Sequence, residues 1–165
     1  GTFLDLKLTG LQGDVMKESM NVAKTLAWSM LDKKTMKKLS KEFDDTKLQG
    51  LHIHCPEGGV PKDGPSAGTA ITIALYSLLV NKKIKNNIAI TGEMCLQGQV
   101  TAIGGLDLKI IGGIRAGVKE FIFPKENDKE FKDFMDKYQD KDLVKDIIFH
   151  QVNNINEVIK LIFEE

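Results

Sequence analysis

A serine at position 66 follows a Gly-Pro pair in the segment PKDGPSAG, residues 61–68. Proline suits the first position of a helix, because the N–H group that it lacks has no partner there in any case. Ser66 should therefore lie in the first turn of a helix over 65–80, where free backbone N–H groups and the helix dipole can stabilise an oxyanion. A serine at a helix start is more often a cap, so this position alone does not define a nucleophile.

A lysine at position 109 lies within an apolar, glycine-rich stretch, IGGLDLKIIGG, residues 103–113. In a helix its neighbours form a face small enough for another segment to approach closely. These neighbours are Gly105, Leu106, Gly112 and Gly113. Desolvation can lower the pKa of a lysine by as much as about 3 to 5 units. We therefore expect Lys109 to be buried, so that its amine can take the proton of Ser66 and later return it to the leaving amine.

Other chemistries are possible around the same loop. Gly59 and Gly64 have the glycine spacing of a phosphate-binding loop, but Pro65 stands where that motif requires lysine, which argues against nucleotide binding. His52 and His54 should share one face of a strand, as zinc ligands can, although no third or fourth ligand is evident. A Ser-His hydrolase that uses His54 with Ser66 is a further alternative to the lysine.

Composition limits the class of protein. The 23 basic and 23 acidic residues cancel, and only one of the basic residues is an arginine, Arg115, so no nucleic-acid partner is indicated. No apolar run approaches the roughly 18 residues of a membrane span. Cys55 and Cys95 show no disulfide or zinc spacing, which favours a reducing compartment and predicts a small buried hydrophobe, rather than a nucleophile, at Cys55.

Hydrophobic periodicity predicts an α/β fold in which strands alternate with helices along one domain, residues 1–165. The helix over 65–80 is apolar on nearly every side and should be buried. The charge-rich segment 32–47 is expected to be a solvated connector. The predicted strands are 3–8, 51–55, 87–91, 119–124 and 147–152, with a hairpin turn near Gly98, and the predicted helices are 15–31, 65–80, 106–116, 128–138 and 155–163.

Four blocks in order resemble the proteolytic domain of the ATP-dependent Lon proteases. They are LTGLQGDVMKES, HIHCPEGGVPKDGPSAG, ITGEMCLQGQVTAIGGL and KIIGGIRAGVKEFIFP, and together they span essentially the whole chain. The resemblance implies a Lon-type α/β domain with mixed sheets and layered helices. It also implies a Ser-Lys dyad, which falls here on Ser66 and Lys109.

The same resemblance assigns supporting roles to other residues. Thr91 matches a position that orients the lysine, and Gly64 belongs to the loop that shapes the oxyanion pocket. Four further residues match polar positions that line or support the site. They are Asp63, His54, His52 and Glu18. The departures from the family's usual residues, such as Gln97 in place of a frequent arginine, remove neither dyad residue.

The resemblance implies a larger protein as well. Family members carry an ATPase module upstream, so we expect ATP and magnesium to bind there and this domain to hold no cofactor or metal. We also expect the first strands of the proteolytic domain to precede this sequence. The implied substrates are unfolded or damaged proteins, the implied assembly is a hexameric ring, and the implied compartment is the bacterial cytosol or the mitochondrial matrix. The alternative is a catalytically silent assembly module of the same fold.

Overall fold

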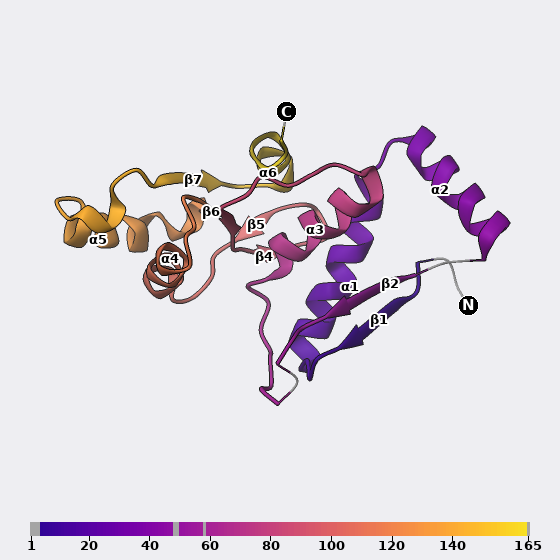
Figure 1. Cartoon of the computed structure of the whole chain (residues 1–165), viewed down its shortest axis with the longest axis horizontal. Helices are drawn as coiled ribbons and strands as arrows, with labels where there is room; N and C mark the ends of the chain where they lie inside the picture. The colour runs from indigo at the N-terminus through magenta and orange to yellow at the C-terminus, as the bar shows by residue number, and fades with distance from the viewer. Residues whose placement is uncertain (1–3, 48–49, 58, 165) are drawn as a thin grey trace.

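The chain folds as an α/β domain with mixed sheets. The computed structural model describes residues 4–47, 50–57 and 59–164. Figure 1 shows α4 and α5 at one end of the molecule, the β1–β2 pair with α1 and α2 at the other, and α3 between them. In chain order the elements are β1 (Leu6–Thr9), α1 (Asp14–Ser29), α2 (Lys33–Thr46), β2 (Leu51–His54), α3 (Gly68–Val80), β3 (Ile88–Ile90), β4 (Glu93–Met94), β5 (Val100–Thr101), α4 (Leu106–Arg115), β6 (Glu120–Pro124), the 3-10 turn η1 (Lys125–Asn127), α5 (Asp128–Tyr138), the 3-10 turn η2 (Asp142–Val144), β7 (Ile148–Val152) and α6 (Ile155–Ile162).

A parallel sheet with strand order β3-β6-β7 forms the centre of the domain. The middle strand, β6, is buried on both faces, as is usual for a strand in a parallel sheet that helices cover. Phe121 and Phe123 point into a core shared with α4 and α5, whereas Ile122 points into a core shared with α1, α3 and α6. The sheet therefore separates two cores and fixes α4 against one of its faces.

The pair β1–β2 is also parallel, with Thr9 opposite His54 in the register. β4 and β5 form a small antiparallel hairpin. Its turn contains Gly98 at φ +89°, which confirms the hairpin predicted from the sequence. The predicted strand over 3–8 is observed as Leu6–Thr9, and residue 3 lies outside the described residues. None of the described helices is both long and apolar enough to cross a membrane.

The expectation of a connector over 32–47 is wrong, because this segment forms the helix α2. The carboxylate of Asp32 accepts a hydrogen bond of 2.6 Å from the backbone N–H of Thr35 and so caps the helix start. Met36, Leu39 and Phe43 recur at helical spacing and are half-buried. The many lysines occupy the rest of the helix surface, and their number concealed this apolar stripe.

The helix predicted over 65–80 begins later and is less buried than expected. It starts at Gly68, with Pro65, Ser66 and Ala67 in a turn before it. Thr72 and Ile73 are fully buried, but Leu78 is 67% exposed. One side of α3 therefore faces outward in the single chain, which an apolar residue pattern alone could not reveal.

Candidate functional site

Ser66 lies in the turn before α3, and hydrogen bonds from the segment after β3 hold this turn. The backbone N–H of Gly92 donates a hydrogen bond of 3.0 Å to the carbonyl oxygen of Ser66. The Thr91 hydroxyl donates a second, of 3.3 Å, to the same oxygen. The backbone N–H of Thr69 in turn donates a hydrogen bond of 3.1 Å to the carbonyl oxygen of Gly92. Because the Ser66 carbonyl oxygen and the Thr69 N–H bond to the segment after β3, they are not free to form helical hydrogen bonds. The helix α3 therefore starts only at Gly68.

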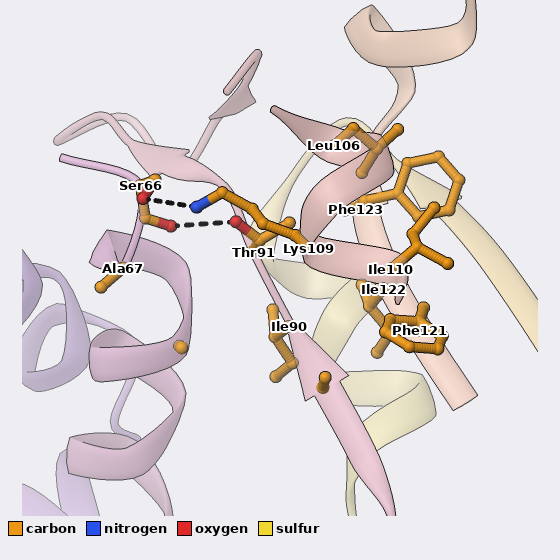
Figure 2. Close-up of a pocket in the computed structure, with 12 residues that line it drawn as sticks. Ser66, Ala67, Ile90, Thr91, Leu106, Lys109, Ile110, Phe121, Ile122 and Phe123 are labelled. Carbon is orange, nitrogen blue, oxygen red and sulfur yellow. Dashed lines mark hydrogen bonds between the residues drawn. The ribbon is translucent and has the colours of Figure 1, made fainter. Parts of the chain in front are cut away.

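Thr91 was expected to orient Lys109, but its hydroxyl forms a hydrogen bond with the serine turn. Its hydroxyl binds the carbonyl oxygen of Ser66, and no hydrogen bond joins it to Lys109 among the described residues. The backbone N–H of Thr91 donates to the Ile122 carbonyl oxygen at 3.0 Å, which ties it to the central sheet. In this structure Thr91 therefore positions the serine turn, and Figure 2 shows it between that turn and Lys109.

Lys109 reaches the site from α4, whose start is fixed by the segment at the beginning of α5. The buried side chain of Asn127 accepts a hydrogen bond of 3.0 Å from the Ile103 N–H and donates one of 2.8 Å to the Ile103 carbonyl oxygen. A Glu130 carboxylate oxygen accepts a hydrogen bond of 3.0 Å from the Leu106 N–H, at the first residue of α4. A carboxylate is favourable at this end of a helix because the helix dipole is positive there.

The two predicted dyad residues meet. Lys109 Nζ donates a hydrogen bond of 3.0 Å to Ser66 Oγ, across a gap between α4 and the turn before α3 (Figure 2). The expected burial of Lys109 is wrong for the single chain, because its side chain is exposed. Gly113 does pack closely, since a Cβ there would lie 2.5 Å from the Phe121 ring. A Cβ on Gly105 or Gly112 would meet no heavy atom within 4 Å among the described residues, so α4 is open at these two positions.

Asp63 connects the loop before Ser66 to the start of α1. Its carboxylate accepts a hydrogen bond of 2.8 Å from the Met16 N–H and thereby caps α1, which begins after Gly13. A Cβ on Gly13 would lie 2.4 Å from Asp63 Cγ, so only glycine leaves room for this carboxylate. The Gly13 N–H also donates to the Lys62 carbonyl oxygen at 2.7 Å. Gly64 follows at φ +115°, a backbone conformation that favours glycine, and turns the chain toward Ser66.

An apolar cavity of about 260 Å³ opens beside Ser66 and Lys109, between α3, β3, α4 and β6. Figure 2 shows the hydroxyl and the amine at its rim and aliphatic and aromatic side chains below them. The apolar lining residues include Ala67, Ala70, Ile90, Leu106, Ile110 and Phe123. An apolar cavity with a few polar groups at its rim is typical of sites that bind a ligand or substrate.

The chain is similar in sequence to proteins of one known family. The family model of the Lon protease (S16) C-terminal proteolytic domain matches residues 2–165. The chain belongs to this family. The Lon protease of Borrelia duttonii is 45% identical over 158 residues, which cover 96% of this chain and 18% of that protein.

Two further relatives extend this result. The Lon protease of Fusobacterium nucleatum is 42% identical over 159 residues, 96% of this chain and 20% of that protein. The Lon protease of Buchnera aphidicola from Acyrthosiphon pisum is 38% identical over 160 residues, 97% of this chain and 19% of that protein. The chain thus spans about a fifth of the length of the curated relatives that it matches.

His52 and His54 of this Lon-type domain lie on one face of β2, as predicted, but both contact a threonine. His52 Nε2 lies 2.8 Å and His54 Nδ1 lies 2.9 Å from Thr9 Oγ1. Among the described residues the hydrogen-bond partner of Ser66 Oγ is Lys109 and not His54. Within that same part of the chain, no group of three or more His, Cys, Asp or Glu side chains is placed to hold a metal ion. Cys55 is half-buried, and its sulfur lies 3.4 Å from Gln12 Nε2.

Several residues that shape the Lon-type site were not identified from the sequence. Glu18, by contrast, was identified from the sequence, and in the structure it lines a smaller hollow together with Pro65. Asn127 and Glu130, which hold the start of α4, lie in a lysine- and glutamate-rich segment that shows no motif. Gly92 was also missed, although a Cβ there would lie 2.5 Å from Val100 Cγ1 and 2.7 Å from Thr69 Oγ1. Its place directly after Thr91 in the TGE motif was the one available signal.

Proposed function

We propose that this chain is the proteolytic part of an ATP-dependent serine endopeptidase in which Ser66 is the nucleophile and Lys109 is the general base. The observation that carries the proposal is the 3.0 Å hydrogen bond between Lys109 Nζ and Ser66 Oγ. Nucleophile and base must lie within hydrogen-bond reach before a proton can pass between them. Membership of the Lon protease family supports the same assignment.

In the proposed reaction the Ser66 oxygen attacks the carbonyl carbon of a peptide bond, and its proton moves to the neutral Lys109 amine. The tetrahedral intermediate then collapses, its C–N bond breaks, and the resulting ammonium of Lys109 donates the proton to the leaving amine. A water molecule attacks the acyl-enzyme next, losing a proton to Lys109, which returns it to the Ser66 oxygen as the acid departs. No metal ion is required at any step.

Backbone N–H groups near Ser66 are suited to bind the oxyanion of the intermediate. Among the described residues, the N–H groups of Gly64, Ser66 and Ala67 donate no hydrogen bond to a protein acceptor. They lie just before the N-terminus of α3, where the helix dipole is positive. Preorganised donors of this kind stabilise negative charge as it develops in the transition state.

The exposure of Lys109 in the single chain has a consequence for the mechanism. A lysine acts as a base only in its neutral form, and removal of water favours the neutral form of an amine. We propose that the bound substrate peptide covers the open side of α4 at Gly105 and Gly112 and so withdraws water from Lys109. The apolar cavity beside Ser66 would hold an apolar side chain of that peptide.

The larger context follows from the family. We propose that the substrates are unfolded or damaged proteins, and that a separate ATPase module with bound ATP and magnesium unfolds and delivers them. We further propose that the parent protein forms a hexameric ring and works in the bacterial cytosol or the mitochondrial matrix. This domain would hold no cofactor, bind no nucleic acid and contact no membrane, in keeping with its balanced charge.

Cleavage of a fluorogenic peptide by the wild type, Ser66→Ala and Lys109→Met tests the proposed function. The peptide should carry one apolar side chain next to the cleavable bond. We expect Lys109→Met to lose about a hundredfold to ten-thousandfold in kcat, because general-base catalysis contributes roughly that much, and Ser66→Ala, which lacks the nucleophile, to lose at least as much. Equal rates in all three proteins would overturn the dyad.

A further inference from the structure

Two buried threonines of α3 form different kinds of hydrogen bond. Thr69 and Thr72 are both fully buried, and each donates from its hydroxyl to a backbone carbonyl oxygen. Thr72 Oγ1 donates at 2.8 Å to Gly68, four residues earlier, which is a usual acceptor for a threonine inside a helix. Thr69 Oγ1 instead donates at 3.0 Å to Gly92, which follows β3 and lies 23 residues further along the chain. The Thr69 hydroxyl therefore joins α3 to a distant segment.

Gly92 bonds to α3 through its carbonyl oxygen and to the turn before α3 through its N–H. The oxygen accepts the Thr69 hydroxyl and, at 3.1 Å, the backbone N–H of Thr69, which lies in the first turn of the helix and has no intrahelical acceptor. The N–H of Gly92 donates at 3.0 Å to the carbonyl oxygen of Ser66. Because a carbonyl oxygen has two lone pairs, the two donors of Thr69 fix the orientation of Gly92 as well as its position.

The contact between Thr69 and Gly92 is tight. A Cβ on Gly92 would lie 2.7 Å from Thr69 Oγ1 and 2.5 Å from Val100 Cγ1, so a side chain at this position would collide with both. Threonine suits the other side of the contact, because its β-branched side chain has few rotamers in a helix. The hydroxyl is thus held in one direction, with the Gly92 carbonyl as its acceptor.

This chain of hydrogen bonds ends at the peptide group between Ser66 and Ala67. Its carbonyl oxygen is held by Gly92 and, at 3.3 Å, by the Thr91 hydroxyl. A peptide group is planar, so a fixed carbonyl also fixes the direction of the Ala67 N–H. That N–H donates no hydrogen bond to another described residue, and Ala67 lines the cavity beside Ser66. The same peptide group sets the backbone from which Ser66 Oγ meets Lys109 Nζ.

We propose that Thr69 is a positioning residue for peptide hydrolysis. Its hydroxyl, through Gly92, holds the peptide group between Ser66 and Ala67, so that Ser66 Oγ stays within reach of Lys109 and the Ala67 N–H keeps a fixed direction for binding the oxyanion. This inference rests on the proposed function and adds to it a residue whose hydroxyl bonds to neither member of the dyad.

Thr69→Val tests the proposal, because it removes the hydroxyl and keeps the shape of the side chain. Thr72→Val is the matched control, since it makes the same change at an equally buried position of the same helix. In Thr69→Val the Gly92 oxygen keeps the Thr69 N–H, so the chain should fold but hold Ser66 less firmly. We expect kcat for the fluorogenic peptide to fall about fivefold to fiftyfold with little change in KM, because a small misplacement of a reacting group acts on the rate. Thr72→Val should match the wild type in both constants.

Rescue and a transition-state analogue distinguish lost positioning from a general loss of structure. Thr69→Ser restores the hydroxyl and should regain most of the wild-type kcat. A peptide boronate, which forms a tetrahedral adduct on Ser66, should bind Thr69→Val about fivefold to fiftyfold more weakly, whereas the peptide amide of the same sequence should bind as it does to the wild type. The proposal is overturned if kcat is the same in Thr69→Val and Thr72→Val, or if Thr69→Ser is as slow as Thr69→Val.

Amide hydrogen exchange separates this inference from the proposed function, because it requires no activity. Exchange of the Gly92 N–H should be about threefold to tenfold faster in Thr69→Val than in the wild type and unchanged in Thr72→Val. If the wild type cleaves peptide while the two valine variants agree in exchange and in kcat, Thr69 has no positioning role and the peptidase function stands. If the wild type cleaves no peptide while the exchange difference is seen, the peptidase function fails and the hold of Thr69 on the Ser66 turn stands.

Discussion

The side-chain amide of Asn127 forms two hydrogen bonds with the backbone of Ile103, one in each direction, of 3.0 Å and 2.8 Å. Asn127 is buried and Ile103 stands just ahead of α4, so this pair fixes where the helix starts. Lys109 lies on α4, so the position of its amine relative to Ser66 depends on where this helix starts. The placement of Lys109 Nζ beside Ser66 Oγ therefore depends in part on Asn127, a residue that forms no hydrogen bond with either of them among the described residues.

Replacement of Asn127 by alanine should destabilise the fold by about 3 kcal/mol, because two buried backbone groups lose their partners. It should also reduce kcat, since α4 would no longer hold Lys109 at a fixed distance from Ser66. Urea unfolding and peptide cleavage measure the two effects. The Asn156→Ala variant on the exposed side of α6 is the control. A stability equal to that of the wild type would contradict the role given to Asn127.

Gly13→Ala should displace the Asp63 carboxylate, because the new Cβ would lie 2.4 Å from Asp63 Cγ. The Met16 N–H would then lose its cap and the loop before Ser66 would shift. We expect kcat to fall roughly tenfold to hundredfold, as small misplacements of a reacting group can cause. Gly59→Ala is the matched control in the same loop, since a Cβ there meets nothing within 4 Å. The interpretation fails if both variants cleave peptide at the wild-type rate.

The glycines of α4 should respond to alanine with opposite signs. A Cβ on Gly113 would lie 2.5 Å from the Phe121 ring, so Gly113→Ala should destabilise the domain by about 1 to 3 kcal/mol. A Cβ on Gly112 meets nothing within 4 Å, so Gly112→Ala should stabilise it by up to about 1 kcal/mol through helix propensity. Thermal unfolding of both variants checks this pair. Destabilisation of equal size in the two would show that the packing of α4 differs from the one described.

These elements show what the sequence could predict. The order of strands and helices follows from hydrophobic periodicity, and the hairpin turn follows from Gly98. Ser66 and Lys109 could be paired because each stands in a short segment whose residue types suit its role. Their 3.0 Å contact joins positions far apart in the sequence, and only the arrangement of α4 against the central sheet brings them together.

The remaining features depend on contacts that leave no local signal. The late start of α3 results from hydrogen bonds to Thr91 and Gly92, which lie beyond the end of that helix. The exposure of Lys109 depends on what covers α4, whereas its neighbouring glycines are equally compatible with a covered or an open face. Helix α2 was missed because a high density of lysine concealed an apolar stripe of three residues.

Acid should loosen the start of α2 through Asp32. The hydrogen bond from the Thr35 N–H lowers the pKa of the Asp32 carboxyl below its ordinary value of 3.8. A carboxyl whose pKa is lower in the folded state stabilises the fold fully above the unfolded-state pKa and loses that contribution as the pH falls through the folded-state pKa. Amide exchange at Thr35 should therefore accelerate below about pH 4, and an Asp32→Asn variant should show no such acceleration in that range. Identical pH profiles for the two proteins would exclude this cap.

The central claim, that the amine of Lys109 takes the proton of Ser66, is tested most directly by the rate at which a fluorophosphonate forms an adduct on Ser66, followed by mass spectrometry. Wild type, Lys109→Met and a control, Lys129→Met on the exposed side of α5, should be compared with Ser66→Ala as the blank. We predict that the control reacts like the wild type and that Lys109→Met reacts at least about a hundredfold more slowly. An adduct on Ser66 that forms in Lys109→Met as fast as in the wild type would contradict the account.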